Sequence, residues 1–471
     1  METPKLTNKH INAYALSNSF NTMAFTVPTL YLNMFMTDYL GISPVAIGTG
    51  MLIARTVDFL VSLIAGIVIE QSNMKNGKYL SWIRMLTFTL FFGNIVQMLD
   101  TSAFIGNPTI RLVIVMLFYI MFHSSMNFFA TSRAALIPKM AGADMEDRKR
   151  LTTRQSQVAA ATGIISSAVT IPAVELVQRV TGSPSLGYTI VAAVFSCCFL
   201  VVNLIFVKLA APFDPPAEAS VQRKTATVKQ MLSSLVTNKQ MLVLFTGFTC
   251  FTIGTQIYGG LTAYYFRVTG TFVSHMSIAL TARSVCALLA SMVGPSIGRK
   301  IGKKGSLLLG WSIYAMGAIC IKAFAINSDG TANLAVMTVA MCLCQSALNL
   351  YSIFMANYYL DCGEYAYYTT GIDNRTMAVT VMNWPTKIGF ALGGSLVGYG
   401  LAWAGYVAPT ADTLPSFAYM DRFMTVLGLI PAGLMILSAL IILVAYKLTD
   451  AQAAEYAKAN AERESAAKAG S

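Results

Sequence analysis

Twelve long apolar runs limit the folds open to this chain more than any other feature of its sequence. A helix rises about 1.5 Å per residue, so about 20 apolar residues cross the roughly 30 Å hydrocarbon core of a bilayer. The runs do not alternate as the strands of a membrane barrel do. The sequence therefore predicts an all-α integral membrane protein, with twelve transmembrane helices near residues 14–38, 45–70, 80–99, 110–132, 155–178, 186–208, 241–266, 274–297, 305–325, 332–359, 376–404 and 421–446.

The composition excludes several classes of protein. Of the 471 residues, 55% are hydrophobic and 11% are charged, whereas soluble domains carry roughly 25% charged residues. A soluble enzyme, a disordered chain and a nucleic-acid-binding protein are therefore excluded. The eight cysteines and three histidines show no metal-ligand spacing, and the sequence has no phosphate-binding glycine loop. We expect no cofactor, and no metal site other than a possible Na+ at Asp58.

Basic residues define the expected orientation in the membrane. Lys and Arg gather in the N-terminal tail, in the loops that follow even-numbered spans and in the C-terminal tail, whereas the opposite loops hold almost none. Cytoplasmic loops of membrane proteins carry this excess. We therefore expect a multi-pass protein of the plasma (inner) membrane with both termini in the cytoplasm. The net charge of +12 then needs no acidic partner.

The longest hydrophilic break divides the spans into two sets of six. We expect an N-terminal six-helix bundle at residues 1–209, a cytoplasmic linker at 210–240, a C-terminal six-helix bundle at 241–447 and a cytoplasmic tail at 448–471. The tail is rich in Ala, Glu and Lys, which predicts a solvated and partly helical end.

An internal repeat supports this division. The segment Ala54-Arg55-Thr56-Val57 of span two resembles Ala282-Arg283-Ser284-Val285 of span eight, and the same offset pairs Gly77 with Gly305. Two six-helix pseudo-repeats predict a major facilitator fold. In that fold the substrate path lies between the repeats near the middle of the membrane, and inward-open and outward-open states alternate.

Ionisable residues inside spans cost about 2.5–3.5 kcal/mol each on insertion scales, so they point to function. Arg55 and Asp58 lie three residues apart, on one side of span two. Asp58 is the candidate for cation coupling, because a carboxylate in a cavity of low dielectric can bind a proton or a sodium ion. The alternative is a structural Arg55–Asp58 pair that only joins helices.

A basic residue and nearby aromatic residues suit a ligand site in the second half. Lys387 of span eleven has no acidic neighbour in its own helix and follows Asn383-Trp384-Pro385, where the proline can break the helix. Lys387 and Trp384 could therefore bind substrate, although a salt bridge from Lys387 to another span is the alternative. Tyr265 belongs to an aromatic cluster that could stack on a sugar ring or form an interfacial belt.

Charged residues at the cytoplasmic ends of the spans suit a gate. Asp361 and Glu364 lie at the end of span ten, and two basic loops contain Lys75 and Arg148. We expect Glu364 to meet these loops when the inner side closes. The alternative is an ordinary solvated acidic loop.

Five segments together carry a resemblance to one known family. They are Ala54-Arg55-Thr56-Val57-Asp58, Asn76-Gly77-Lys78 with Trp82, Arg154 at the start of span five, Asp361-Cys362-Gly363-Glu364-Tyr365, and Lys387 with the glycine-rich stretch after it. This set resembles the glycoside–pentoside–hexuronide:cation symporter family over nearly the whole chain. The resemblance implies a secondary symporter for a sugar or sugar derivative, coupled to H+ or Na+. It also implies that Asp58 contributes to the cation site, that Lys387 lies near both sites and that Arg154 lies by the cavity.

The chain departs from the family pattern at three positions. Ser62 stands where a family member has a second carboxylate in span two, which favours a proton but leaves sodium open because Ser62 could partly replace that ligand. The carboxylates that bind galactosides in the family are also missing. Their positions fall near Asn21 and Thr22 in span one and between Asn127 and Ala130 in span four. The resemblance therefore makes Asn21, Thr22 and Asn127 candidate substrate-binding residues.

The missing carboxylates change the expected charge of the cavity. With Arg154 and Lys387 kept and Arg133 at the end of span four, the cavity is net positive and favours a carboxylate or sulfonate on the substrate. We therefore expect a monomeric symporter that takes up an anionic sugar derivative, such as a hexuronide, a glucuronide or a sulfosugar. The alternatives are a carrier of neutral glycosides or of a non-sugar amphiphile and, more remotely, a polytopic receptor or membrane enzyme.

Overall fold

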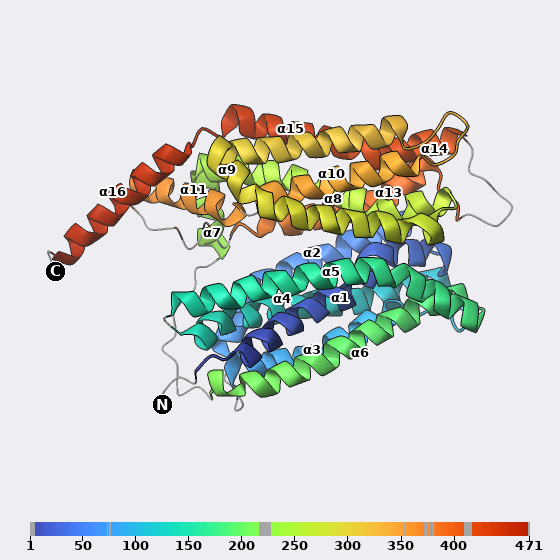
Figure 1. The fold of residues 1–471 in the computed structure, drawn as a ribbon, viewed down its shortest axis with the longest axis horizontal. Coiled ribbons are helices and arrows are strands. Elements are labelled where there is room, and N and C mark those ends of the chain that lie inside the picture. The colour runs from blue at the N-terminus through green and yellow to red at the C-terminus, as the bar shows by residue number, and fades with distance from the viewer. Residues whose placement is uncertain are drawn as a thin grey trace. The chain divides into compact units, whose positions relative to one another are not determined.

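The structure is a computed structural model that describes residues 5–72, 74, 77–142, 144–215, 228–352, 354–371, 375, 378, 381–408 and 417–469. Its regular structure is helical, apart from one β-bridge between Ile326 and Ala332. The helices, drawn in Figure 1, are α1 (Asn8–Asp38), α2 (Pro44–Gln71), α3 (Lys78–Val96), α4 (Pro108–Ala141), α5 (Met145–Thr181), α6 (Pro184–Ala210), η1 (Ala211–Phe213), α7 (Val228–Thr237), α8 (Lys239–Val268), α9 (Phe272–Phe324), α10 (Leu334–Ser352), α11 (Met355–Thr370), α13 (Trp384–Ala404), α14 (Phe417–Met424), η2 (Thr425–Leu429), α15 (Ile430–Ala445) and α16 (Asp450–Ala469).

Nine helical stretches of the described residues are long and apolar enough to cross a membrane. One of them, α9, holds two predicted spans, because the helix continues through a kink at Gly302, where φ is 74°. The first and eleventh predicted spans fall outside the nine. They correspond to α1 and α13, whose polar residues and glycines lower the mean hydropathy. The described helices therefore account for all twelve predicted spans.

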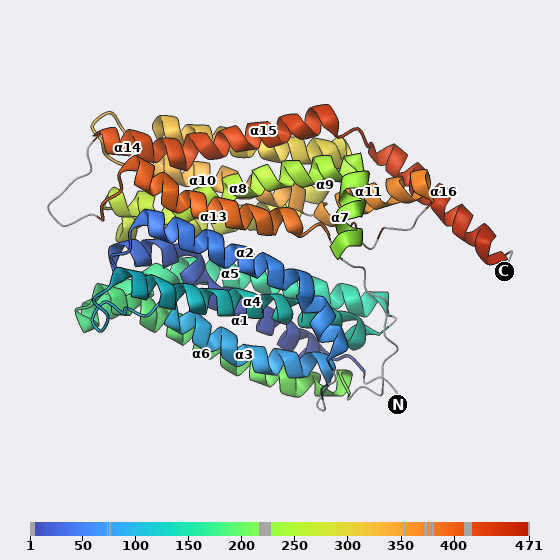
Figure 2. The same ribbon diagram turned by 180° about the vertical axis from the view of Figure 1, so that it is seen from behind.

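Contacts between residues divide the chain into two compact units. The first contains Met1–Lys224, Thr262–Ser284 and Leu401–Pro415. In this unit α1 packs against α5 and α6, α2 packs against α4, and α3 packs against α4 and α6. These helices run side by side in Figures 1 and 2. Their core contains fully buried aromatic side chains, among them Tyr31 and Tyr188.

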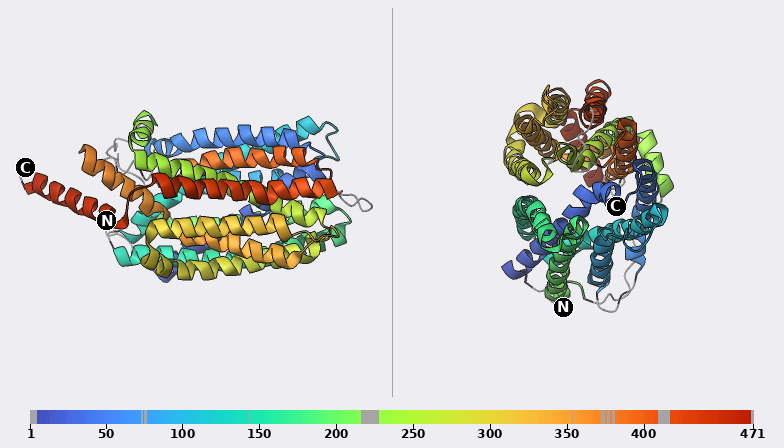
Figure 3. Two further views of the ribbon diagram at one scale, coloured as in Figure 1. Left: turned by 90° about the horizontal axis from the view of Figure 1, so that it is seen from above. Right: turned by 90° about the vertical axis from the view of Figure 1, so that its right-hand side faces the viewer.

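The second unit contains Thr225–Leu261, Val285–Gly400 and Ser416–Ser471, and Figure 3 shows its helices from two further directions. Buried Trp311 of α9 stacks on Phe251 of α8, with ring centroids 5.3 Å apart. The glycines of α13 let this helix approach α8 closely. A Cβ atom at Gly389 would lie 2.5 Å from the Cβ of Thr252, so a larger residue would force the two helices apart.

The same capping device occurs once in each unit. In the first, Gly77 with φ of 89° precedes α3, and Oδ2 of Asp214 accepts from the backbone N–H groups of Tyr79 and Leu80 at 2.6 and 2.9 Å. In the second, Gly302 marks the kink in α9, and Oδ2 of Asp450 accepts from the N–H of the following residue at 3.0 Å. Asp214 follows the sixth predicted span and Asp450 follows the twelfth, so these contacts agree with an internal repeat.

The segment predicted as linker contains helices that were not expected, and the tail, which was predicted to be partly helical, forms one helix. The described part of 210–240 contains η1 and α7, while residues 216–227 lie outside the described residues. The tail forms α16, which packs against α11 (Figure 1). The face of α16 that packs against α11 is buried, so the expectation of a solvated tail is wrong for that face. Tyr456 stacks on Tyr368 with centroids 4.6 Å apart, and Asn460 is fully buried.

Candidate functional site

Asp58 lies inside the first unit, on the face of α2 that meets α4. Its side chain is fully buried, and Nδ2 of Asn127 donates to its Oδ1 at 2.7 Å and to its backbone carbonyl at 3.3 Å. Nη1 of Arg55 lies 3.9 Å from Oδ2. A buried carboxylate needs such partners because the loss of water around its charge is costly. The structure thus brings Asp58 and Arg55 together, and it adds Asn127, which the sequence had suggested for the substrate.

Arg55 also contacts two aromatic side chains of α4. Its Nη1 lies 3.2 Å from Nδ1 of His123, and the centre of its guanidinium lies 5.0 Å from the centroid of the Tyr119 ring. A guanidinium can only donate, so Nδ1 of His123 is the acceptor in this contact. Tyr119, His123 and Asn127 are spaced by four residues and therefore share one face of α4.

Ser62 lies one turn after Asp58 on α2. Its hydroxyl donates to the backbone carbonyl of Phe59 at 2.6 Å, so it is bound to its own helix. Among the described residues, no group of three or more His, Cys, Asp or Glu side chains could hold a metal ion.

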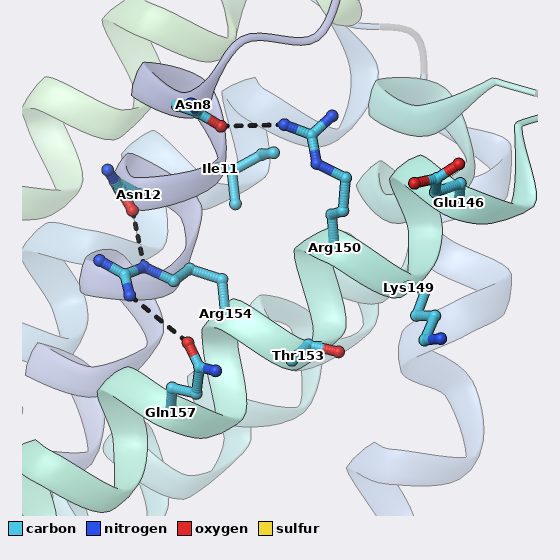
Figure 4. Close-up of a pocket in the computed structure, with 9 residues that line it drawn as sticks. All are labelled: Asn8, Ile11, Asn12, Glu146, Lys149, Arg150, Thr153, Arg154 and Gln157. Carbon is cyan, nitrogen blue, oxygen red and sulfur yellow. Dashed lines mark hydrogen bonds between the residues drawn. The ribbon is translucent and has the colours of Figure 1, made fainter.

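Arg154 lines a cavity of about 860 Å³ between the first two turns of α1 and the first four turns of α5. Figure 4 shows its guanidinium between two amides: Nε donates to Oδ1 of Asn12 at 2.8 Å, and Nη1 donates to Oε1 of Gln157 at 3.4 Å. Arg150 reaches Oδ1 of Asn8 at 2.9 Å in the same cavity. Amide oxygens bind a guanidinium without cancelling its charge.

The lining of this cavity is net positive. Arg154, Arg150 and Lys149 contribute three positive charges, and Glu146 contributes one negative charge. Asp147 forms an ion pair with Arg150 at 2.7 Å, so the lining keeps a net charge of +1 with this neighbour included. The arrangement can therefore bind an anion by charge-assisted hydrogen bonds.

Arg133 lies elsewhere, in the interior of the first unit. It is 4% exposed, and it donates to the hydroxyl of Ser17 at 2.7 Å and to the carbonyl of Tyr14 at 3.0 Å. Its guanidinium also lies 4.7 Å from the centroid of the Tyr14 ring. Arg133 is not at the end of a span as expected, because α4 continues to Ala141. These contacts join α4 to α1.

The remaining predicted substrate residues lie on three helices. On α1, Asn21 is half-buried and Thr22 is exposed, with its hydroxyl donating to the carbonyl of Asn18 at 3.2 Å. On α8, Tyr265 is fully buried. Trp384 is the first residue of α13 and is buried, while Lys387 is half-buried in the first turn. The helix start at Trp384 agrees with the break expected at the proline.

The predicted gate residues have partners within their own units. Arg148 donates from Nη2 to the carbonyl of Gly142 at 2.8 Å, at the end of α4. Asp361 forms an ion pair with Lys303. Glu364 lies 3.2 Å from Nη1 of Arg375 and accepts from Nδ2 of Asn460 at 2.7 Å. Lys75 lies outside the described residues.

Sequence reasoning missed the residues that hold the predicted ones in place. His123 and Tyr119 contact Arg55, and Asn12 contacts Arg154. One signal was available, because polar and aromatic residues recur every fourth position along α4. The partner of Arg154 had no such signal, since α1 and α5 are far apart in sequence.

Comparison with known proteins identifies relatives along almost the whole chain. The family model described as "MFS/sugar transport protein" matches residues 13–450. The isoprimeverose transporter of Lactiplantibacillus pentosus is 23% identical over 85% of this chain and 81% of its own. The glucuronide carrier protein homolog of Escherichia coli K12 is 24% identical, over 95% and 94%. A putative sulfoquinovose importer of Salmonella typhimurium LT2 is 24% identical, over 95% and 91%.

Solved structures of the same fold confirm the expected architecture. A structure of the nucleoside transporter NupG matches with a TM-score of 0.64 at 15% identity, over 93% of this chain and 99% of that one. A proton-dependent oligopeptide transporter matches with a TM-score of 0.66 at 11% identity, over 93% and 98%. The all-α membrane architecture and the major facilitator fold that the sequence predicts are therefore confirmed.

Proposed function

Because this chain belongs to the MFS/sugar transport protein family, we propose that it is a symporter that couples a cation gradient to the uptake of an anionic sugar derivative. Family membership makes the chain a multi-pass membrane transporter and not an enzyme. It also implies a sugar-type small molecule as substrate and a cation as coupling ion. The charge of the substrate, the identity of the ion and the direction of transport belong to the proposal.

The observation that carries the proposal is the charge of the cavity between α1 and α5. Arg154 is held there by the amides of Asn12 and Gln157, and Arg150 and Lys149 line the same space. A carboxylate or sulfonate can replace an amide oxygen on Arg154 and form a stronger, charge-assisted hydrogen bond. The other proposed substrate residues are not among those that line this cavity; they are Lys387 and Trp384 at the start of α13, Asn21 and Thr22 on α1, and Tyr265 on α8.

The names of two relatives support an anionic substrate. A glucuronide carries a carboxylate and sulfoquinovose carries a sulfonate, and the chain is 24% identical to proteins named for each. One relative favours a second candidate function, because isoprimeverose is a neutral disaccharide. A carrier of neutral glycosides is therefore the alternative.

For the coupling ion, we propose Asp58 as the binding residue. Its burial and its contact with Asn127 resemble neither a solvated surface acid nor a simple ion pair. Binding of a proton or Na+ would neutralise this carboxylate and thereby change which conformations are low in free energy. Arg55 and Ser62 lie beside it, within one turn on α2.

The organisation of the molecule is part of the proposal. We infer two six-helix bundles at residues 1–209 and 241–447, joined by the 210–240 linker and followed by the 448–471 tail. Both termini face the cytoplasm of an inner membrane, as the excess of basic residues in the corresponding loops suggests. We also propose that the protein acts as a monomer and that Asp361, Glu364, Arg148 and Lys75 form the cytoplasmic gate.

Uptake into membrane vesicles tests the substrate and the ion together. Vesicles with an imposed Na+ or H+ gradient are given radiolabelled glucuronide, and uptake is competed with hexuronides, sulfosugars and neutral glycosides. We expect accumulation driven by one of the two gradients, with strong competition by the anionic sugars. Competition by neutral glycosides alone would favour the second candidate function.

The substitution Asp58→Asn tests the coupling residue. The amide keeps the size of the side chain but cannot carry the charge that a cation neutralises. We expect accumulation against a gradient to be lost, while exchange of substrate across the vesicle membrane is kept. Accumulation by the Asp58→Asn variant at the wild-type level would show that Asp58 is structural.

A further inference from the structure

The contacts of Arg55 point to a residue that the proposed mechanism does not use. We propose that His123, together with Tyr119, is a positioning residue that holds the Arg55 guanidinium at a distance from the carboxylate of Asp58. This inference rests on the proposed function, because it concerns the same cation site.

The geometry on α4 separates an arginine from an aspartate that share one helix. His123 and Tyr119 bind the guanidinium of Arg55, at 3.2 Å from Nη1 and 5.0 Å from the guanidinium centre. One turn further along the same face, Asn127 binds the carboxylate of Asp58 at 2.7 Å. Different residues of α4 therefore hold the two charges, and Nη1 stays 3.9 Å from Oδ2.

The distance of 3.9 Å between Nη1 of Arg55 and Oδ2 of Asp58 is long, because an arginine and a carboxylate form a much closer pair when nothing prevents it. Charge-assisted hydrogen bonds between them are about 2.7–2.9 Å long and are often bidentate, using both carboxylate oxygens. In a buried site such a pair is strong. It would compete directly with a coupling cation for the oxygens of Asp58.

The face of α4 that carries Tyr119, His123 and Asn127 therefore affects how tightly Asp58 binds the coupling cation. With Arg55 held by His123, the carboxylate keeps a positive neighbour whose Nη1 lies 3.9 Å from Oδ2, further than the 3.2 Å between Nη1 and Nδ1 of His123. Removing the imidazole takes away the acceptor and lets the guanidinium turn toward Asp58. We expect the affinity for the cation to fall, because the cation must then displace Arg55 from the carboxylate.

The experiment measures cation affinity in purified full-length protein. Thermal stabilisation is followed during titration with NaCl at constant ionic strength, with choline chloride as the replacement salt, and during titration of pH without Na+. The variants are His123→Ala, the conservative His123→Gln, Tyr119→Leu and Arg55→Gln, with the double variants His123→Ala/Arg55→Gln and Tyr119→Leu/Arg55→Gln. The matched control is His275→Ala, because His275 is exposed at the start of α9.

We expect His123→Ala to shift the half-saturating cation concentration about tenfold toward weaker binding, as loss of a hydrogen bond to a charged group would. His123→Gln restores an acceptor for Arg55 and is expected to stay near wild type, as is His275→Ala. Without the Arg55 charge the imidazole has nothing to position, so His123→Ala is expected to have no further effect in the Arg55→Gln background. A merely structural role for His123 would not show this non-additivity.

Failure of the positioning role of His123 can be distinguished from failure of the proposed symport function. An equal loss of cation affinity from His123→Ala with and without Arg55 overturns the positioning role and leaves the proposed function intact. A wild-type cation affinity in the His123→Ala variant would also overturn the positioning role and leave the proposed function intact. If His123→Ala does not accumulate as folded protein, Tyr119→Leu and His123→Gln carry the test, and an effect of Tyr119→Leu that is additive with Arg55→Gln overturns it. Failure of the proposed function shows itself separately, through accumulation by Asp58→Asn.

Discussion

Three arginines in the first unit differ in what surrounds their charge. Arg133 is enclosed by Ser17, the carbonyl of Tyr14 and aromatic rings, so its charge is used inside the protein. Arg55 is shared between α2 and α4. Arg154 lines an open cavity and is bound by side-chain amides. Because guanidinium groups stay charged in proteins, only the surroundings of Arg154 suit recognition of an anion that enters and leaves.

The substitution Arg154→Gln tests this assignment. The glutamine amide can still hydrogen-bond to Asn12, but it offers no charge to an anionic sugar. We expect the KM for glucuronide to rise about tenfold or more, consistent with the loss of a charge-assisted hydrogen bond, and the uptake of neutral glycosides to change little. The control is Arg179→Gln near the far end of α5, where Arg179 is exposed and pairs with Glu175. Equal losses for anionic and neutral sugars would contradict a role for Arg154 in charge recognition.

For single residues, the sequence predicts the functional importance of charged side chains better than that of their neutral partners. Asp58, Arg55 and Arg154 are recognisable because a charge in an apolar run is costly and needs a reason. Asn12, His123 and Tyr119 are neutral, and their position in a helix carries no comparable penalty. Their roles depend on which helices pack together, and that information is spread over segments far apart in the chain. The proposed site could therefore be found only in part before the structure.

The bounds of a helix were predictable wherever the length of its apolar run alone determines where it begins and ends. The bounds of α2 and α6 agree with their apolar runs, since a buried backbone in lipid must bond within its own helix. Helix ends are less predictable. The prediction ended span four at residue 132, yet α4 continues to Ala141, because Arg133 is buried inside the first unit and the residues after it, such as Leu136 and Met140, also pack there. The docking of α16 was also missed, because it depends on Tyr456 meeting α11.

The capped helix α3 allows a stability prediction at the scale of an element. Asp214 is 2% exposed and binds two backbone N–H groups and Lys139. The substitution Asp214→Ala removes a helix cap and leaves Lys139 without this carboxylate, which together costs about 3 kcal/mol. We expect the Tm in detergent to fall by several degrees.

Asp450→Ala is the matched comparison for this cap. Asp450 occupies the equivalent place in the second unit, but its side chain is 48% exposed. The expected loss is about 1 kcal/mol or less. Equal Tm values for Asp214→Ala and wild type would contradict the capping role.

A second element-scale prediction concerns α16. Tyr456 packs between Tyr365 and Tyr368, with centroids 5.8 and 4.6 Å away. Removing the ring by Tyr456→Ala costs about 1 kcal/mol in aromatic contacts, plus the buried area. We expect the backbone amides of α16 to exchange hydrogen for deuterium about tenfold faster. In the control Glu462→Ala, which alters only an exposed pair with Lys458, exchange should stay unchanged.

At the scale of the whole molecule, duplication explains more of the chain than any single motif. The sequence repeat between spans two and eight continues in the structure as the two glycine–aspartate caps, one in each unit. A repeat of this kind with parallel halves requires an even number of spans in total, because each half must begin on the same side of the membrane. It follows that the two termini share a side, and the basic loops indicate which side it is.

Cysteine labelling of intact cells tests this topology. In a full-length variant whose eight native cysteines are replaced by serine, single cysteines are placed at Phe104, Asp329, Lys300 or Lys458, all of them exposed. Phe104 and Asp329 follow odd-numbered predicted spans, whereas Lys300 lies in α9 between predicted spans eight and nine and Lys458 lies in α16. We expect a membrane-impermeant maleimide to label Phe104→Cys and Asp329→Cys in intact cells.

Labelling of Lys300→Cys and Lys458→Cys should require permeabilised membranes, because basic segments remain in the cytoplasm. The reverse pattern would invert the orientation, and a mixed pattern among the four would contradict two parallel six-helix halves.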